Sequence, residues 1–173
     1  MTTFKQRYHA QQERTAARYA AWLPGWRNRR VRRRALLAWL ACAVATLVVG
    51  LFAGDIRSAV FAVWWGLLVI TVVLQMLNKV LTNNIGERTA RLLDERELAL
   101  RGRCGYVGFL VAVWSMVIAA MVLASTPLGS TPFGPFVLLV SLIALASNVP
   151  TGLLAWQLPD DEPDPIAEGD RRG

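Results

Sequence analysis

Four stretches of this chain contain no Asp, Glu, Lys, Arg or His, and each is close to the length of a membrane-spanning helix. They cover residues 35–53, 59–78, 104–124 and 135–157. A helix needs about 20 apolar residues to cross the hydrocarbon core of a bilayer. Because a backbone in lipid must satisfy its own hydrogen bonds, an α-helix is expected for each stretch. We therefore predict an all-α polytopic membrane protein whose four transmembrane helices form two hairpins.

The basic residues are distributed unevenly among the segments that join these stretches. Six of the eight residues 27–34 are arginine, and of the 19 lysine and arginine residues only Arg57 lies within a hairpin turn. Dense basic charge next to a span stays in the cytoplasm. The sequence therefore predicts a multi-pass membrane protein with both termini cytoplasmic. The expected cytoplasmic parts are a basic amphipathic arm (1–34), a connector (79–103) and an acidic, disordered tail (158–173).

The N-terminal arm carries aromatic residues at helical spacing. Together with Thr15 they recur at steps of three, four or seven, which predicts an amphipathic helix. Such a basic helix suits an anionic membrane surface, and the alternative is that it packs on a protein partner or on the connector. No nucleic-acid partner is expected, because the positive-inside rule already accounts for the arginines. The residues expected to contact lipid or a protein partner are Phe4, Tyr8, Tyr19, Trp22, Trp26, Arg27, Arg29, Arg30, Arg32, Arg33 and Arg34.

The connector is predicted to contain a short charged helix. Asn84 and Glu87 fit a capping box at its start, and its end is expected near Gly102, just before the third span. Opposite charges spaced four residues apart would meet along one face of this helix. The residues of this predicted interaction helix are Glu87, Arg91, Asp94, Glu95, Arg96, Glu97 and Arg101.

The segment Leu93–Arg101 reads Leu-Asp-Glu-Arg-Glu-Leu-Ala-Leu-Arg and stands before an apolar span. It resembles a stretch in small uncharacterised four-span membrane proteins of actinobacteria and other Gram-positive bacteria, in which an Asp-Glu-Arg run also precedes a transmembrane helix. The resemblance implies a bacterial inner-membrane protein and implies no activity.

The fourth span contains a polar break, Ser147–Gly152. Pro150 cannot donate a hydrogen bond to the Ala146 carbonyl, and Asn148 or Thr151 could satisfy the freed backbone groups or contact a neighbouring helix. Broken helices mark binding sites in some transporters, whereas a simple kink near the cytoplasmic end is the more common structure. Both interpretations stay open from the sequence.

Other polar residues in the spans are expected to form hydrogen bonds between helices. Gln75 is the best buried candidate, so the predicted intramembrane polar site consists of Gln75, Asn148, Pro150 and Thr151. Thr46, Thr71, Asn78, Ser115, Ser141 and Ser147 are the remaining polar residues of the spans. Trp64 and Trp65 lie about one turn from the outer end of the second span, where an interfacial aromatic belt is expected.

The spans offer no acid or base for chemistry. Proton relays, ion-coupled transport and intramembrane metal sites normally need an ionisable group at depth, and Cys42 and Cys104 have no metal-like spacing. No cofactor and no enzymatic activity are expected. The predicted function is that of a non-catalytic accessory or scaffold subunit, in a larger inner-membrane complex or a homo-oligomer, which acts through helix packing and its charged cytoplasmic segments. The alternative is a small transporter or channel component.

Overall fold

The computed structural model describes residues 28–82, 84–85 and 93–158. The predictions for the N-terminal arm up to Arg27, for the connector residues 86–92 and for the acidic tail beyond Leu158 fall outside these residues. The described part of the chain is all-helical and contains no strand.

The described residues form four long helices, and a short 3-10 turn lies between the last two. They are α2 (Arg29–Gly50), α3 (Ala59–Leu81), α4 (Glu95–Ser125) and α5 (Gly134–Gln157), and the 3-10 turn η3 is Pro127–Ser130. Each of the four helices is long and apolar enough to cross a membrane. This confirms the prediction of an all-α chain with four candidate membrane spans.

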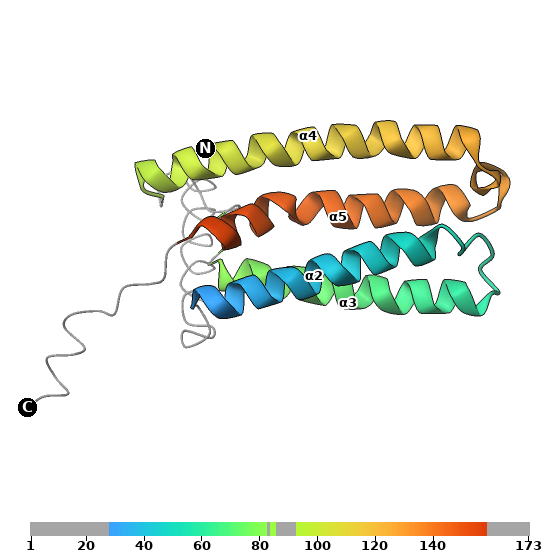
Figure 1. Cartoon of the computed structure of the whole chain (residues 1–173), viewed down its shortest axis with the longest axis horizontal. Helices are drawn as coiled ribbons and strands as arrows, with labels where there is room; N and C mark the ends of the chain where they lie inside the picture. Colours follow the sequence, from blue (N-terminus) through green and yellow to red (C-terminus); the bar gives the residue numbers. More distant parts are fainter. Residues whose placement is uncertain (1–27, 83, 86–92, 159–173) are drawn as a thin grey trace, which may run out of the picture.

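The helices lie side by side, with α4 at one edge of the bundle (Figure 1). Helix α2 packs on α3 and α5, whereas α4 packs chiefly on α5. The start of α2, the end of α3, the start of α4 and the end of α5 share one end of the bundle, which we call the arginine end. The opposite end, formed by residues 51–58 and 126–133, is called the loop end.

Helix α2 begins inside the arginine cluster rather than after it. The Asn28 side chain caps the helix by accepting a hydrogen bond from the Val31 N–H at 2.8 Å. An asparagine at this position satisfies one of the backbone donors that a helix start leaves without a partner. Five of the six arginines are therefore the first turns of the span helix, and only Arg27 precedes the cap.

Helix α4 joins the end of the connector to the third span without a break. Asp94 caps it, and Asp94 and Glu97 form a reciprocal capping box. Asn84 instead has φ of 53°, and its N–H donates to the Lys79 carbonyl at 2.8 Å, as at a helix C-terminus. The predicted helix start at Asn84 depends on Glu87, which lies outside the described residues, whereas the predicted end near Gly102 is wrong because α4 continues through it. A glycine in a helix interior lowers helix stability by only about 1 kcal/mol, and good helix formers flank Gly102, so the helix is not interrupted there.

Three clusters of buried apolar side chains hold the helices together. The cluster near the loop end is built on Trp64 and joins α3 to α5. A second cluster, around Ala119 and Leu138, lies between α4 and α5, and a third, around Cys104 and Leu154, closes the arginine end. Trp64 is wholly buried, whereas its neighbour Trp65 is 53% exposed. The expectation that both indoles lie in an interfacial belt is therefore wrong for Trp64, which is a core residue.

Candidate functional site

Two arginines near the start of α2 bind the C-terminus of α5. The Arg32 side chain is 2% exposed, and its Nη2 donates to the Leu158 carbonyl at 2.9 Å. Arg33 places its guanidinium carbon 4.2 Å from the ring centroid of Trp156, a cation–π contact. Cations stabilise the negative end of a helix dipole. These contacts tie the first and last described helices together at the arginine end.

The other described arginines of the cluster point outward. Arg29, Arg30 and Arg34 are exposed on the first turns of α2, so their positions are compatible with the predicted contact to lipid or to a protein partner. Arg27 and the aromatic residues of the arm (Phe4, Tyr8, Tyr19, Trp22 and Trp26) lie outside the described residues, and so do Glu87 and Arg91 of the predicted interaction helix.

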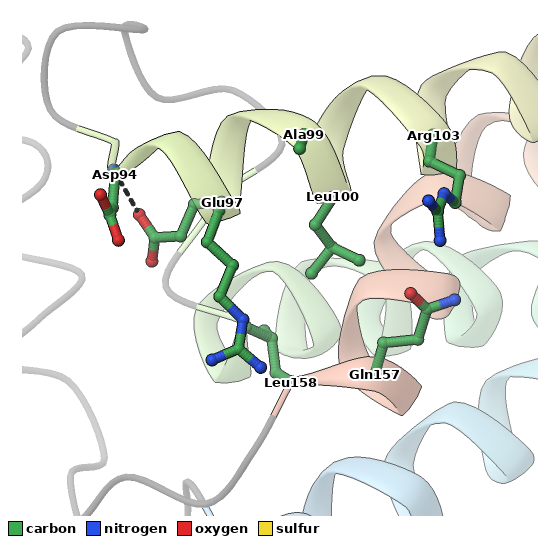
Figure 2. Close-up of a pocket in the computed structure, with 8 residues that line it drawn as sticks. Asp94, Glu97, Ala99, Leu100, Arg103, Gln157 and Leu158 are labelled. Atoms are coloured by element: carbon green, nitrogen blue, oxygen red, sulfur yellow. Dashed lines mark hydrogen bonds between the residues drawn. The ribbon is translucent and has the colours of Figure 1, made fainter.

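A pocket of about 690 Å³ opens at the arginine end, between the first turns of α4 and the end of α5. Figure 2 shows the Arg103 side chain reaching from α4 toward Gln157 of α5, with Leu100 beside them. The two acids of this pocket serve the helix cap: Oδ1 of Asp94 accepts from the Glu95 N–H at 2.7 Å, and Oε2 of Glu97 accepts from the Asp94 N–H at 3.3 Å. The carboxylates are therefore partly satisfied by the backbone.

Asp94, Glu95, Arg96, Glu97 and Arg101, which were predicted to belong to a separate interaction helix, all lie on α4 or at its cap. Asp94, Glu95 and Arg96 are exposed, and Glu97 and Arg101 are half-buried. The structure thus places these charges on an extension of a candidate membrane span.

Hydrogen bonds between side chains link the helices inside the bundle. The Thr46 and Thr71 hydroxyls lie 3.1 Å apart between α2 and α3. Nε1 of Trp64 donates to the Ser141 hydroxyl at 2.9 Å, between α3 and α5. The predicted helix-bonding role of these threonines and of Ser141 is confirmed, and Trp64 was not predicted to take part.

The predicted intramembrane polar residues differ in their surroundings. Gln75 is half-buried and donates through Nε2 to the Ser147 hydroxyl at 3.2 Å, again between α3 and α5. Pro150 lies inside α5, which continues through it, and a methyl group added to Gly108 of α4 would overlap its ring. The polar break is therefore a point of close α4–α5 packing and does not interrupt the helix. Thr151, the residue after Pro150, is half-buried.

Asn148 is wholly buried, and in the described chain neither atom of its amide has a hydrogen-bond partner. The same holds for Asn78 of α3, and the buried indole N–H of Trp39 in α2 also lacks a partner there. Sequence reasoning selected Asn148 but treated Asn78 as an ordinary helix-bonding residue and did not consider Trp39. Asn78 lies seven residues after Thr71 on α3, and Trp39 lies seven residues before Thr46 on α2. Asn78 and Trp39 are therefore on the same helix faces as the hydrogen-bonded threonines.

The described residues contain no group of His, Cys, Asp and Glu side chains that could hold a metal ion. Comparison of the chain with protein-family models, with curated proteins and with solved structures gives no significant match.

Proposed function

We propose that this chain is a non-catalytic accessory or scaffold subunit of a larger complex in the bacterial inner membrane. Its arginine end would face the cytoplasm, in accordance with the positive-inside rule. The exposed arginines Arg29, Arg30 and Arg34 would contact anionic lipid headgroups or a protein partner at that surface.

The observation that supports this proposal most directly is the position of α4. This helix packs chiefly on α5, and its buried positions in the described structure are four small residues: Cys104, Gly108, Ser115 and Ala119. Small residues let two membrane helices approach closely. The other positions of α4 are exposed or half-buried. The exposed ones include several aromatic and methionine side chains, which are enriched at protein interfaces. The most exposed of these are Tyr106, Phe109, Trp114, Met116 and Met121.

The length of α4 gives a second argument. Its 31 residues extend about 46 Å at 1.5 Å per residue, whereas the hydrocarbon core is about 30 Å thick. If the loop end of α4 lies at the outer boundary of the core, the first turns of α4 extend into the cytoplasm. Those turns contain Glu95, Arg96, Glu97, Arg101 and Arg103. A charged rod that continues a span offers a partner one rigid surface across the membrane boundary.

The test compares exposed tryptophans on two different helices. A photo-crosslinking residue replaces Trp114 of α4, which is 64% exposed, or Trp65 of α3, which is 53% exposed. In native membranes we expect a discrete protein adduct from position 114 and only lipid adducts from position 65. The same protein should co-purify with the chain in mild detergent, and its yield should fall when Phe109→Ala and Trp114→Ala are combined. Lipid adducts alone at position 114, together with purification as a lone monomer, would disprove the proposal.

The second candidate function is a small transporter or channel component. Gln75 and Asn148 support it, since they place amides between α3 and α5 in the half of the bundle nearer the arginine end. Under this candidate, replacing both residues with leucine should abolish transport without loss of folded protein. Intact transport by the double variant would rule it out.

A further inference from the structure

Three polar side chains in the bundle are buried and have no hydrogen-bond partner in the described chain. Asn78 and Asn148 are 0% exposed and Trp39 is 3% exposed. The unpartnered atoms are Nδ2 and Oδ1 of both asparagines and Nε1 of the tryptophan. Buried polar groups in native proteins nearly always have a partner, because an unsatisfied one costs free energy. The five polar atoms of these three side chains therefore need an explanation.

Trp39 and Asn78 occupy matching register positions of the α2–α3 interface. Thr46 of α2 and Thr71 of α3 are in hydrogen-bond contact, with their hydroxyls 3.1 Å apart. The two helices are antiparallel, as consecutive members of a hairpin. Seven residues toward the arginine end, about two helical turns, the corresponding positions are Trp39 on α2 and Asn78 on α3. Residues seven apart lie on nearly the same face of a helix, so these two side chains point into the same interface.

Asn148 enters this interface at the same depth from α5. Nε2 of Gln75 lies 3.2 Å from the Ser147 hydroxyl, which sets the register of the parallel helices α3 and α5. Toward the arginine end, Asn78 lies three residues past Gln75, and Asn148 lies one residue past Ser147. The two asparagines therefore differ in depth by two residues, or about 3 Å at 1.5 Å per residue.

The face of α5 that contains Asn148 is also established by contacts. Ser141, seven residues before Asn148, accepts a hydrogen bond from Trp64 of α3. A methyl group added to Gly152, four residues after Asn148, would lie 2.8 Å from Cδ1 of Leu36 in α2. Asn148 thus belongs to the stripe of α5 that packs against both α2 and α3.

The chemistry of the three side chains identifies the ligand. Together they offer five N–H donors and two carbonyl oxygen acceptors, and they have no formal charge. A cation would satisfy only the two oxygens, and an anion only the N–H groups. A ligand that both donates and accepts hydrogen bonds satisfies both kinds of group, and water is the smallest such ligand. Buried waters typically make about three hydrogen bonds to groups of this kind.

We propose that Trp39, Asn78 and Asn148 form an internal water-binding site between α2, α3 and α5, nearer the arginine end than the loop end. The site is independent of the proposed scaffold function. Its water molecules bridge the two amides and the indole, and so connect three helices that meet in no other described polar cluster at this depth. The site also gives the polar residue Asn148 a structural role that does not require a transported substrate.

The first experiment compares two buried indoles in the unmodified chain. The Nε1–H of Trp39 faces the proposed water, whereas the Nε1–H of Trp64 is equally buried and donates to Ser141. Hydrogen–deuterium exchange of both is followed by NMR of the ¹⁵N-indole-labelled protein in lipid, with Trp39→Phe and Trp64→Phe used to assign the signals. We expect Trp39 to exchange at least tenfold faster than Trp64. Equal or slower exchange at Trp39 would overturn the proposal, and a dependence of its rate on Na⁺ or Cl⁻ would overturn the assignment to water.

The second experiment measures access by thiol reactivity. Asn148→Cys is introduced into a chain with Cys42→Ala and Cys104→Ala, and Ala119→Cys in the same background is the matched control. Ala119 is 2% exposed and belongs to the apolar α4–α5 cluster. Because apolar surroundings disfavour the reactive thiolate, a small membrane-permeant thiol reagent should modify position 148 at least tenfold faster than position 119. Equal rates at the two positions would contradict the proposal even if the tryptophan signals cannot be resolved.

Discussion

The hydrogen bond between Trp64 and Ser141 offers a quantitative test of how this bundle is held together. Nε1 of Trp64 donates to the Ser141 hydroxyl at 2.9 Å, and that hydroxyl donates to the Val137 carbonyl of its own helix at 2.7 Å. Ser141 therefore keeps a partner when Trp64 is changed, but the indole loses its partner when Ser141 is changed. This asymmetry predicts different energies for the two single substitutions and a non-additive double variant.

The expected magnitudes follow from the burial of both groups. Ser141→Ala leaves an unpaired N–H in a wholly buried indole, which costs about 1–3 kcal/mol. Hydrogen bonds between membrane helices average about 0.6 kcal/mol and reach about 1.7 kcal/mol, so we expect a value near 1 kcal/mol. Trp64→Phe removes part of a ring that contacts Phe61 and Phe136 and should cost roughly 1–2 kcal/mol of packing. The double variant should be little less stable than Trp64→Phe alone, because no donor is left without a partner.

The assay is a double-mutant cycle on the free energy of unfolding, measured in mixed micelles by circular dichroism. Ser125→Ala is the matched control, because the Ser125 hydroxyl is exposed and donates only to the Met121 carbonyl of its own helix. The control should change stability by less than about 0.5 kcal/mol. If Ser141→Ala destabilises the protein equally with Trp or with Phe at position 64, the hydrogen bond contributes nothing, and our reasoning about the core is wrong.

Gly108→Ala should destabilise the α4–α5 pair by about 1–3 kcal/mol through overpacking on the Pro150 ring, whereas Gly105→Ala, with open space around its Cβ position, should be neutral or slightly stabilising in the same unfolding assay. Asp94→Ala removes the cap of α4 and should cost about 1 kcal/mol, seen as faster backbone hydrogen exchange in its first turns, while the exposed Arg96→Ala should leave that exchange unchanged. Reporters fused to either terminus should be active only in the cytoplasm; an active periplasmic reporter at either end would reject the predicted orientation.

The number of spans was predictable because it depends on local composition. Lipid requires an uncharged helix of a set length, and the structure begins α5 within one residue of the predicted span and ends it at the same residue. The starts of α2 and α4 were not predictable in the same way. Both helices continue past the apolar stretch into charged sequence, where apolar composition no longer marks a boundary. The structure begins α4 after the Asp94 cap, beside the packing of Leu93 with Cys104 at the arginine end.

The sequence could not predict which individual side chains are buried. In a soluble helix the polar face identifies the buried one, but a helix in lipid is apolar on both faces, so that periodic signal is weak. Trp64 and Trp65 are adjacent and chemically identical, yet only the contact with α5 makes one of them a core residue. The sequence by itself determined four helices of bilayer length and the end at which the basic charge lies. Both features follow from local composition, because lipid excludes charged residues and sets the length of a spanning helix. Only the tertiary structure decided that Trp39, Asn78 and Asn148 are buried without a hydrogen-bond partner in the described chain, because their burial arises from the packing of helices far apart in the sequence.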